Sequence, residues 1–205
     1  MNYITQAGII SAFAFATIAT ADIPSMGGPM KHVDVTLNAS NNLEVHVDTS
    51  TGMPMLTRYP GEQYDAAASV LDGTFYNAQY GWTVSGFWAP PQDSYIWIDQ
   101  VAVTSGLRVY SGGTMMNQGS FDPIFGTEGS DTAIMWDGTM LHNWYATDLH
   151  GEYEATYRVY LGDINAQPTA GFGDAFVTLN WGTIPTPGAL AVLSVSGLLA
   201  TRRRR

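Results

Sequence analysis

Histidines and acidic residues alternate with aliphatic residues in two short segments near the start of the chain. His32 and Asp34 alternate with valines in the first segment, and His46 does so in the second. Such alternation is typical of half-buried β-strands, and the asparagine-rich stretch between the segments is typical of a turn. We therefore predict a β-hairpin in which Leu37 and Leu43 pair beside the turn.

This register brings the polar side chains of the hairpin together. Asp34 is expected opposite His46, and His32 opposite Asp48, with about 5 Å between the Cβ atoms of opposed residues. Two imidazoles and two carboxylates on one patch are suitable ligands for zinc or another divalent metal. A cross-strand ladder of charged residues that binds no metal is the alternative interpretation.

A second pair of histidines lies later in the chain. His142 begins an expected strand, and His150 lies in the turn Asp148–Gly151. Because two isolated histidines at this spacing do not define a site, a turn histidine and a solvent-facing strand residue are the alternatives to a metal site. The candidate metal ligands are His32, Asp34, His46 and His142.

Other chemistries have weaker support in the sequence. It contains no Gly-x-Ser-x-Gly motif, phosphate-binding loop or His-Glu-x-x-His motif, so we predict a non-catalytic protein. Acidic residues in a glycine-rich stretch could ligate calcium, although without EF-hand spacing; they are Asp122, Glu128, Asp131 and Asp137. Trp82, Trp88 and Trp97 could form a sugar-stacking platform, or they could belong to the core.

The elements that must position these residues are strands. Patterns typical of strands recur, and the longest cover Tyr95–Val103, Glu152–Leu161 and Ala175–Trp181. Only Tyr64–Leu71 has a helical pattern. Many short strands separated by Gly, Asn and Pro turns indicate an all-β fold, and we predict an antiparallel β-sandwich, jelly-roll or immunoglobulin-like, with a barrel as alternative. Residues 22–183 are expected to form this single domain.

The composition excludes several classes of protein. The chain has 205 residues, no cysteine, and 8 basic against 18 acidic residues, a net charge of −10. The absence of cysteine excludes a disulfide scaffold and a thiolate zinc site. The acidic balance argues against nucleic acid as a partner. Residues 22–183 carry all 18 acidic residues and only four basic ones, a net charge of −14, so their surface should attract cations.

The N-terminal segment has the pattern of a secretory signal peptide. Residues 7–19 are apolar, and Ala19 and Ala21 provide the small residues expected before a cleavage site. We predict a signal helix over residues 1–21 and cleavage by signal peptidase before Asp22. A buried N-terminal helix or a membrane anchor is the alternative, although the apolar run is shorter than the roughly 20 residues that span a membrane.

The C-terminal segment, residues 184–205, has three parts. A proline-rich break is followed by a short apolar stretch, residues 189–200, expected to be helical, and then by a cluster of arginines. The residues of the break and the cluster are Pro185, Thr186, Pro187, Gly188, Arg202, Arg203, Arg204 and Arg205. This order resembles the bacterial PEP-CTERM sorting signal, in the variant with Thr at the central position.

That resemblance implies processing by an exosortase in a Gram-negative-type envelope. The tail would insert transiently into the membrane and be removed near Pro185–Gly188, which would release the protein to the cell surface or extracellular matrix. A plain tail anchor is the alternative.

A second resemblance covers much of residues 31–161. This region has His32-Val33-Asp34 near its start and later His142-Asn143-Trp144 followed by Gly151-Glu152-Tyr153. This order resembles the choice-of-anchor M family of surface-anchored bacterial domains, some of which are encoded beside metal transporters. The resemblance implies a β-sandwich that brings His32 and His142 together around a metal. The family's His-x-His pair is reduced here to the single His142.

Together these patterns predict an exported, non-catalytic protein of the cell surface or extracellular matrix, with a divalent metal site as one hypothesis. A carbohydrate-binding surface module, with extracellular polysaccharide as partner, is the alternative.

Overall fold

The structure, a computed structural model, describes residues 22–183 apart from 66, 87 and 115–116. The predicted signal peptide, with Ala19 and Ala21, and the predicted sorting signal from Pro185 to Arg205 lie outside the described residues. Within the described ranges, no helix is long and apolar enough to cross a membrane.

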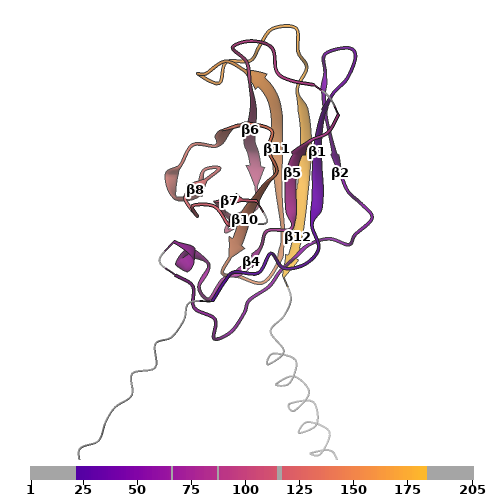
Figure 1. The fold of residues 1–205 in the computed structure, drawn as a ribbon. Helices are drawn as coiled ribbons and strands as arrows, with labels where there is room; N and C mark the ends of the chain where they lie inside the picture. The colour runs from indigo at the N-terminus through magenta and orange to yellow at the C-terminus, as the bar shows by residue number, and fades with distance from the viewer. Residues whose placement is uncertain (1–21, 66, 87, 115–116, 184–205) are drawn as a thin grey trace, which may run out of the picture.

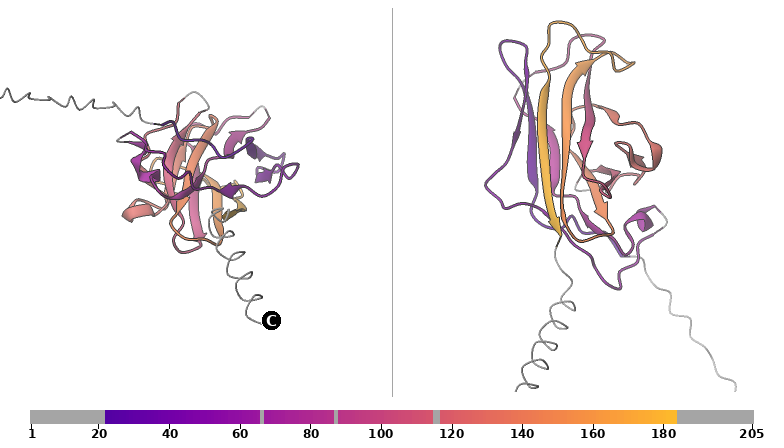
Figure 2. Two further views of the ribbon diagram at one scale, coloured as in Figure 1. Left: turned by 90° about the horizontal axis from the view of Figure 1, so that it is seen from below. Right: turned by 180° about the vertical axis from the view of Figure 1, so that it is seen from behind.

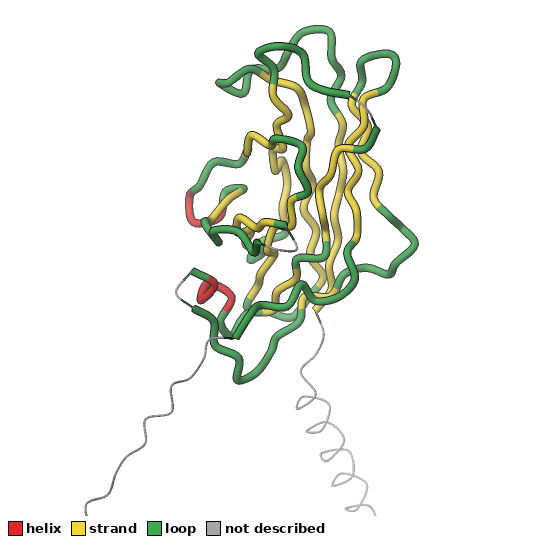
Figure 3. Tube along the Cα trace, in the orientation of Figure 1, coloured by secondary structure: helices red, strands yellow, loops and turns green. Residues whose placement is uncertain are grey.

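Two β-sheets make up most of the described chain (Figure 1, Figure 3). The seven-stranded sheet has the order β2 (Leu43–Val47), β1 (Lys31–Leu37), β5 (Tyr80–Val84), β10 (Leu141–Thr147), β7 (Arg108–Gly113) and β8 (Pro123–Ile124), and β4 (Phe75–Asn77) also pairs with β10. The five-stranded sheet has the order β3 (Met55–Leu56), β12 (Ala175–Thr183), β11 (Glu152–Gly162), β6 (Tyr95–Val103) and β9 (Ala133–Trp136). Figure 2 shows β11 and β12, in orange and yellow, side by side. The helical elements described are two 3-10 turns, η1 (Ala68–Leu71) and η2 (Thr127–Gly129).

The prediction of purely antiparallel sheets is wrong, because each sheet contains a parallel pair. β1 runs parallel to β5, and β12 runs parallel to β3. A hairpin connection joins antiparallel strands, and the hairpin partner β2 already occupies one edge of β1. Only the other edge of β1 is free to pair with a later strand. The chain passes through residues 48–79 before β5 pairs with the other edge of β1, and a crossover of this length permits the parallel direction.

The register of the first hairpin is confirmed. Asp34 pairs with His46, and the apolar pair beside the turn is also present. The backbone N–H of Asp48 donates to the carbonyl oxygen of His32 over 3.0 Å, as the same register requires. The side chain of Asn38 accepts hydrogen bonds from two backbone N–H groups of the turn, which explains why the chain reverses there.

The main hydrophobic core lies between the two sheets. Val33 and Val35 are fully buried on the first sheet, and Tyr157 is fully buried on the second. The ring of Trp82 packs edge-on against Tyr157, with 5.5 Å between the ring centroids. Burial of one large apolar side chain contributes about 1.5–3 kcal/mol. Trp82 is therefore a core residue, which excludes it from a sugar-stacking platform.

A second apolar cluster covers the outer face of the first sheet. Trp144 and Ala146 of β10 and Tyr76 of β4 form its base, and Tyr64 and Phe121 pack over them from the connecting segments. The ring of Phe121 is stacked on Trp144 with 5.4 Å between centroids. This second cluster therefore buries part of the outer face of the seven-stranded sheet. It also gives the candidate site surroundings of low polarity.

Candidate functional site

His142, in β10, is the buried histidine of the described chain, with 4% of its surface exposed. Its Nδ1 lies 2.9 Å from the carbonyl oxygen of Ala78. Because a carbonyl only accepts hydrogen bonds, Nδ1 carries the proton in this bond and Nε2 presents a lone pair. That Nε2 atom is buried and has no hydrogen-bond partner.

The environment keeps this ring neutral. Burial lowers the pKa of His142, since the charged ring would lose its hydration, and the nearby His32 lowers it further; the carbonyl groups of Ala78 and Tyr80 oppose the shift. A neutral imidazole with one nitrogen held by a carbonyl is the arrangement that histidine ligands adopt around metals. The Nε2 lone pair of His142 is therefore available to bind a metal ion.

A break between β4 and β5 positions the carbonyl that holds His142. Both strands pair with β10, and the chain departs from strand geometry at Ala78 and Gln79. The side chain of Asn77 accepts the backbone N–H of Gln79 over 2.8 Å and stabilises the break. The backbone N–H of Ala78 donates to Met26 over 3.0 Å, while its carbonyl accepts from His142. The break thus links the N-terminal segment to the histidine.

Gly81 lies between His142 and His32. It pairs with His32 of β1 on one side and with His142 of β10 on the other, so all three residues occupy one row across the first sheet. A Cβ atom at Gly81 would lie 2.5 Å from Cε1 and 2.7 Å from Nε2 of His142. The imidazole therefore occupies the space that a side chain would fill, and it leans across the row toward His32.

His32 is the half-buried member of this row. Its Nε2 lies 3.2 Å from the sulfur of Met30, which directly precedes β1. The ring of His142 lies over Gly81, the residue that pairs with His32, and His32 is near enough to lower the pKa of His142. The row therefore brings two imidazoles and a thioether to one region.

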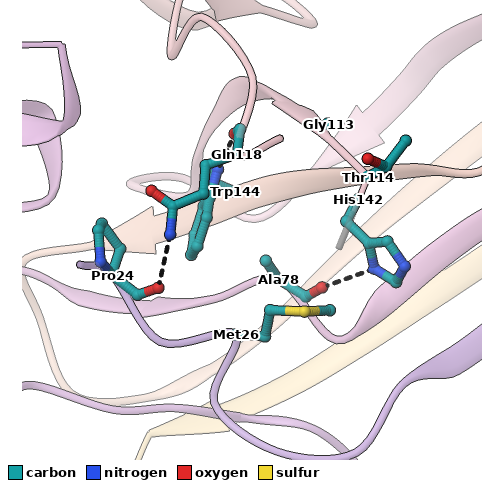
Figure 4. A pocket seen from close by; sticks show the side chains of 8 residues that line it. All are labelled: Pro24, Met26, Ala78, Gly113, Thr114, Gln118, His142 and Trp144. Atoms are coloured by element: carbon teal, nitrogen blue, oxygen red, sulfur yellow. Dashed lines mark hydrogen bonds between the residues drawn. The ribbon is translucent and has the colours of Figure 1, made fainter. Parts of the chain in front are cut away.

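A cavity of about 170 Å³ adjoins His142. Its lining residues are Pro24, Met26, Ala78, Gly113, Thr114, Gln118, His142 and Trp144 (Figure 4). The indole N–H of Trp144 donates to the carbonyl of Gln118, and the Gln118 amide donates to the carbonyl of Pro24. In Figure 4, Nδ1 of His142 faces Ala78, and Nε2 lies on the opposite side of the ring. The lining residues of the cavity therefore surround the ring, with Ala78 and Met26 beside Nδ1.

The other two candidate ligands, Asp34 and His46, do not join this row. They face each other across the hairpin, but the side chain of His46 is 68% exposed and its Nε2 lies 3.6 Å from the carboxylate of Glu44. Among the residues that the structure describes, no three His, Asp or Glu side chains form a group that could hold a metal. The structure places His32 and His142 in one row, on either side of Gly81, and leaves Asp34 and His46 on the polar surface of the hairpin.

His150 has the environment of a turn histidine. Its Nδ1 lies 3.3 Å from the hydroxyl of Thr183, and its ring packs against Phe75 with 4.4 Å between centroids. These contacts come from the ends of β12 and β4 and connect the turn to both sheets.

The remaining candidates do not converge either. Asp122 accepts a hydrogen bond from Ser120, and Asp137 accepts two from Thr139, which are local turn contacts. Glu128 accepts from the hydroxyl of Tyr110 at 3.3 Å. Trp88 packs against the main core, whereas Trp97 is half-buried on the outer face of the second sheet. Asp122, Glu128 and Asp137 thus have structural partners, and Asp131 accepts a hydrogen bond from the backbone N–H of Gly126 through its carbonyl oxygen.

Gly81 and Met30 were not predicted from the sequence as residues of the site. A glycine inside an alternating strand often marks a close approach of another group, and this signal was available at Gly81. Met30 carried no pattern of its own, because its relevance depends on the side chain of His32.

No family model, no curated protein and no solved structure matches this chain.

Proposed function

We propose that this chain is an exported, non-catalytic β-sandwich protein of the cell surface or extracellular matrix, processed by signal peptidase and an exosortase, that binds a metal ion through His32 and His142. Zinc is one of the divalent metals that imidazole nitrogens commonly bind. The net charge of −14 over residues 22–183 would raise the local concentration of cations.

The observation that carries the metal-binding proposal is the state of His142. A buried imidazole nitrogen without a partner costs free energy, because its hydration is lost and nothing replaces it. An ion bound between His142 and His32 would supply the missing interaction. Gly81 provides the room, since any larger residue would occupy the position of the ring.

Zinc titration of the purified protein tests this part of the proposal. We expect about one ion per chain by calorimetry and a melting temperature that rises with zinc, because a ligand that binds only the native state stabilises it. His142→Gln and His32→Ala should each weaken binding at least tenfold. His46→Ala, which changes an exposed residue of the same hairpin, should leave it within twofold. Equal zinc affinity in wild type, His142→Gln and His32→Ala would refute the site.

Export is tested by the mass of the mature protein. In a strain that contains an exosortase, the released form should begin at Asp22 and lack the arginine cluster. In the same strain without the exosortase, or when Arg202–Arg205 are replaced by Gln, the tail should be retained in the envelope fraction. Release with an intact tail in both strains would contradict the sorting proposal.

Carbohydrate binding is the second candidate function, and the outer face of the second sheet favours it. Phe176 and Met135 are 62% and 47% exposed there, and Trp97 pairs directly with Met135. Exposed rings on a flat sheet can stack on sugar faces. Retention on insoluble polysaccharide that is lost in Phe176→Ala and Trp97→Ala would support this function, and equal retention of these variants would exclude this face.

A further inference from the structure

The segment Met26–Met30, here called the strap, crosses the break between β4 and β5 beside His142. The carbonyl of Met26 accepts the backbone N–H of Ala78, and the carbonyl of Pro29 accepts the side-chain amide of Gln79 over 2.7 Å. The backbone N–H of Lys31 then donates to the carbonyl of Gln79 over 2.8 Å, where β1 begins. These bonds hold the strap against the break from both ends.

Two glycines allow the strap to lie this close. Gly27 and Gly28 have φ values of +90° and +153°, which L side chains rarely adopt. A Cβ atom at Gly27 would lie 2.5 Å from the Asn77 amide nitrogen, and one at Gly28 would lie 2.7 Å from that of Gln79. The close approach brings two methionines to this region: Met26 lines the cavity beside His142, and Met30 contacts His32.

We infer that the site is selective for monovalent copper, with Nε2 of His142, the imidazole of His32 and the sulfur of Met30 as its three ligands. This inference rests on the proposed metal-binding function. Two independent observations carry it: the unpartnered Nε2 of His142, which is 4% exposed, and the contact between Met30 and His32.

The donor set favours copper(I) for two reasons. A thioether is a soft ligand that selects copper(I), while imidazole binds copper as well as zinc. All three donors are neutral, so they compensate a single positive charge more easily than two in low-polarity surroundings. The distance of 3.2 Å between His32 Nε2 and Met30 Sδ also suits a shared ion, because two atoms bound at about 2.0 and 2.3 Å to one metal lie roughly 3–4 Å apart.

Competition with a chromophoric chelator tests the inference. The purified full chain is titrated anaerobically, with ascorbate present, into copper(I) held by bicinchoninate, and zinc affinity is measured in parallel. We expect wild type to withdraw one copper(I) per chain. Met30→Leu should lose at least tenfold in copper(I) affinity while its zinc affinity stays within twofold. Leucine for methionine nearly conserves volume, so this variant should remain folded, as its melting curve will show.

Met26→Leu is the matched control, because Met26 belongs to the same strap but lines the cavity instead of contacting His32. It should retain wild-type copper(I) affinity, and Met135→Leu on the other sheet should too. Copper K-edge X-ray absorption should show a sulfur neighbour in wild type and Met26→Leu that is absent in Met30→Leu.

The outcomes separate this inference from the function on which it rests. If copper(I) binds equally to wild type and Met30→Leu, or if only zinc binds, the sulfur ligand is refuted and the histidine site stands. If neither metal binds and His142→Gln matches wild type throughout, both proposals fail.

Discussion

Gly81→Ala is the substitution that tests the geometry of the site most directly. The added Cβ would lie 2.5 Å from Cε1 of His142, at least 0.9 Å closer than ordinary van der Waals contact at 3.4 Å. The backbone at Gly81 does not have positive φ, so alanine brings no strain of that kind. The imidazole must therefore move, and the hydrogen bond from Nδ1 to Ala78 must lengthen or break.

The expected cost follows from overpacking. Inserting a methyl group into a packed region costs about 1–3 kcal/mol. Alanine also reduces the entropy of the unfolded chain, which offsets about 0.4–1 kcal/mol. Gly182→Ala is the matched control, because Gly182 also lies in a strand but its added Cβ would meet only the flexible ends of Met53 and Met55, at 3.1 Å. Both variants share the entropy effect, so the difference between them should be about 1–3 kcal/mol.

Urea denaturation and metal titration measure the two consequences. For a domain of this size the difference corresponds to roughly 2–12 °C in melting temperature. Metal affinity should fall at least tenfold in Gly81→Ala, about 1.4 kcal/mol, and remain unchanged in Gly182→Ala. If Gly81→Ala and Gly182→Ala are equally stable and bind metal equally, the close contact between Gly81 and the ring does not position the site, and the reasoning is wrong.

Two further predictions concern the same region. In the metal-free protein, the folded state keeps His142 neutral, because burial lowers its pKa, while the unfolded chain takes up a proton. The free energy of unfolding should therefore fall as pH drops below about 6.5. For this group the fall is at most about 1.4 kcal/mol per pH unit. Urea denaturation between pH 5 and 8 with a chelator should show a shallower slope for His142→Gln, and identical slopes would contradict the assignment. Gly27→Ala should cost roughly 1–2 kcal/mol because of its φ of +90°, and it should accelerate hydrogen exchange at the Ala78 N–H that donates to Met26. Unchanged exchange at Ala78 would show that the strap does not depend on Gly27.

Local pattern predicted much of the first hairpin. Alternation over a few residues determines which side chains share a face, and the asparagine-rich turn sets the register, so the opposition of Asp34 and His46 followed from neighbouring residues alone. The same local rule placed both residues in a metal site, which the exposure of His46 does not support. The strand Tyr95–Val103 was likewise predicted with its observed bounds.

The pairing that creates the candidate site was not predictable in this way. His32 and His142 lie in one row only because β5 pairs with β1 in parallel and with β10 in antiparallel fashion. The connections involved are long, and no periodicity in the sequence specifies which strand edges meet across them. The antiparallel prediction failed for this reason.

The sequence by itself determined the all-β class, the acidic charge and the identity of the donor atoms, because composition and short-range alternation depend on residues that are neighbours in the chain. Only the tertiary structure decided which donors share a site. Gly81 leaves room for a ring from another strand, the break at Ala78 selects its tautomer, and the strap brings the sulfur of Met30 to His32. Each of these depends on contacts between segments far apart in sequence, where packing and hydrogen-bond satisfaction of the whole fold, rather than local preference, set the geometry.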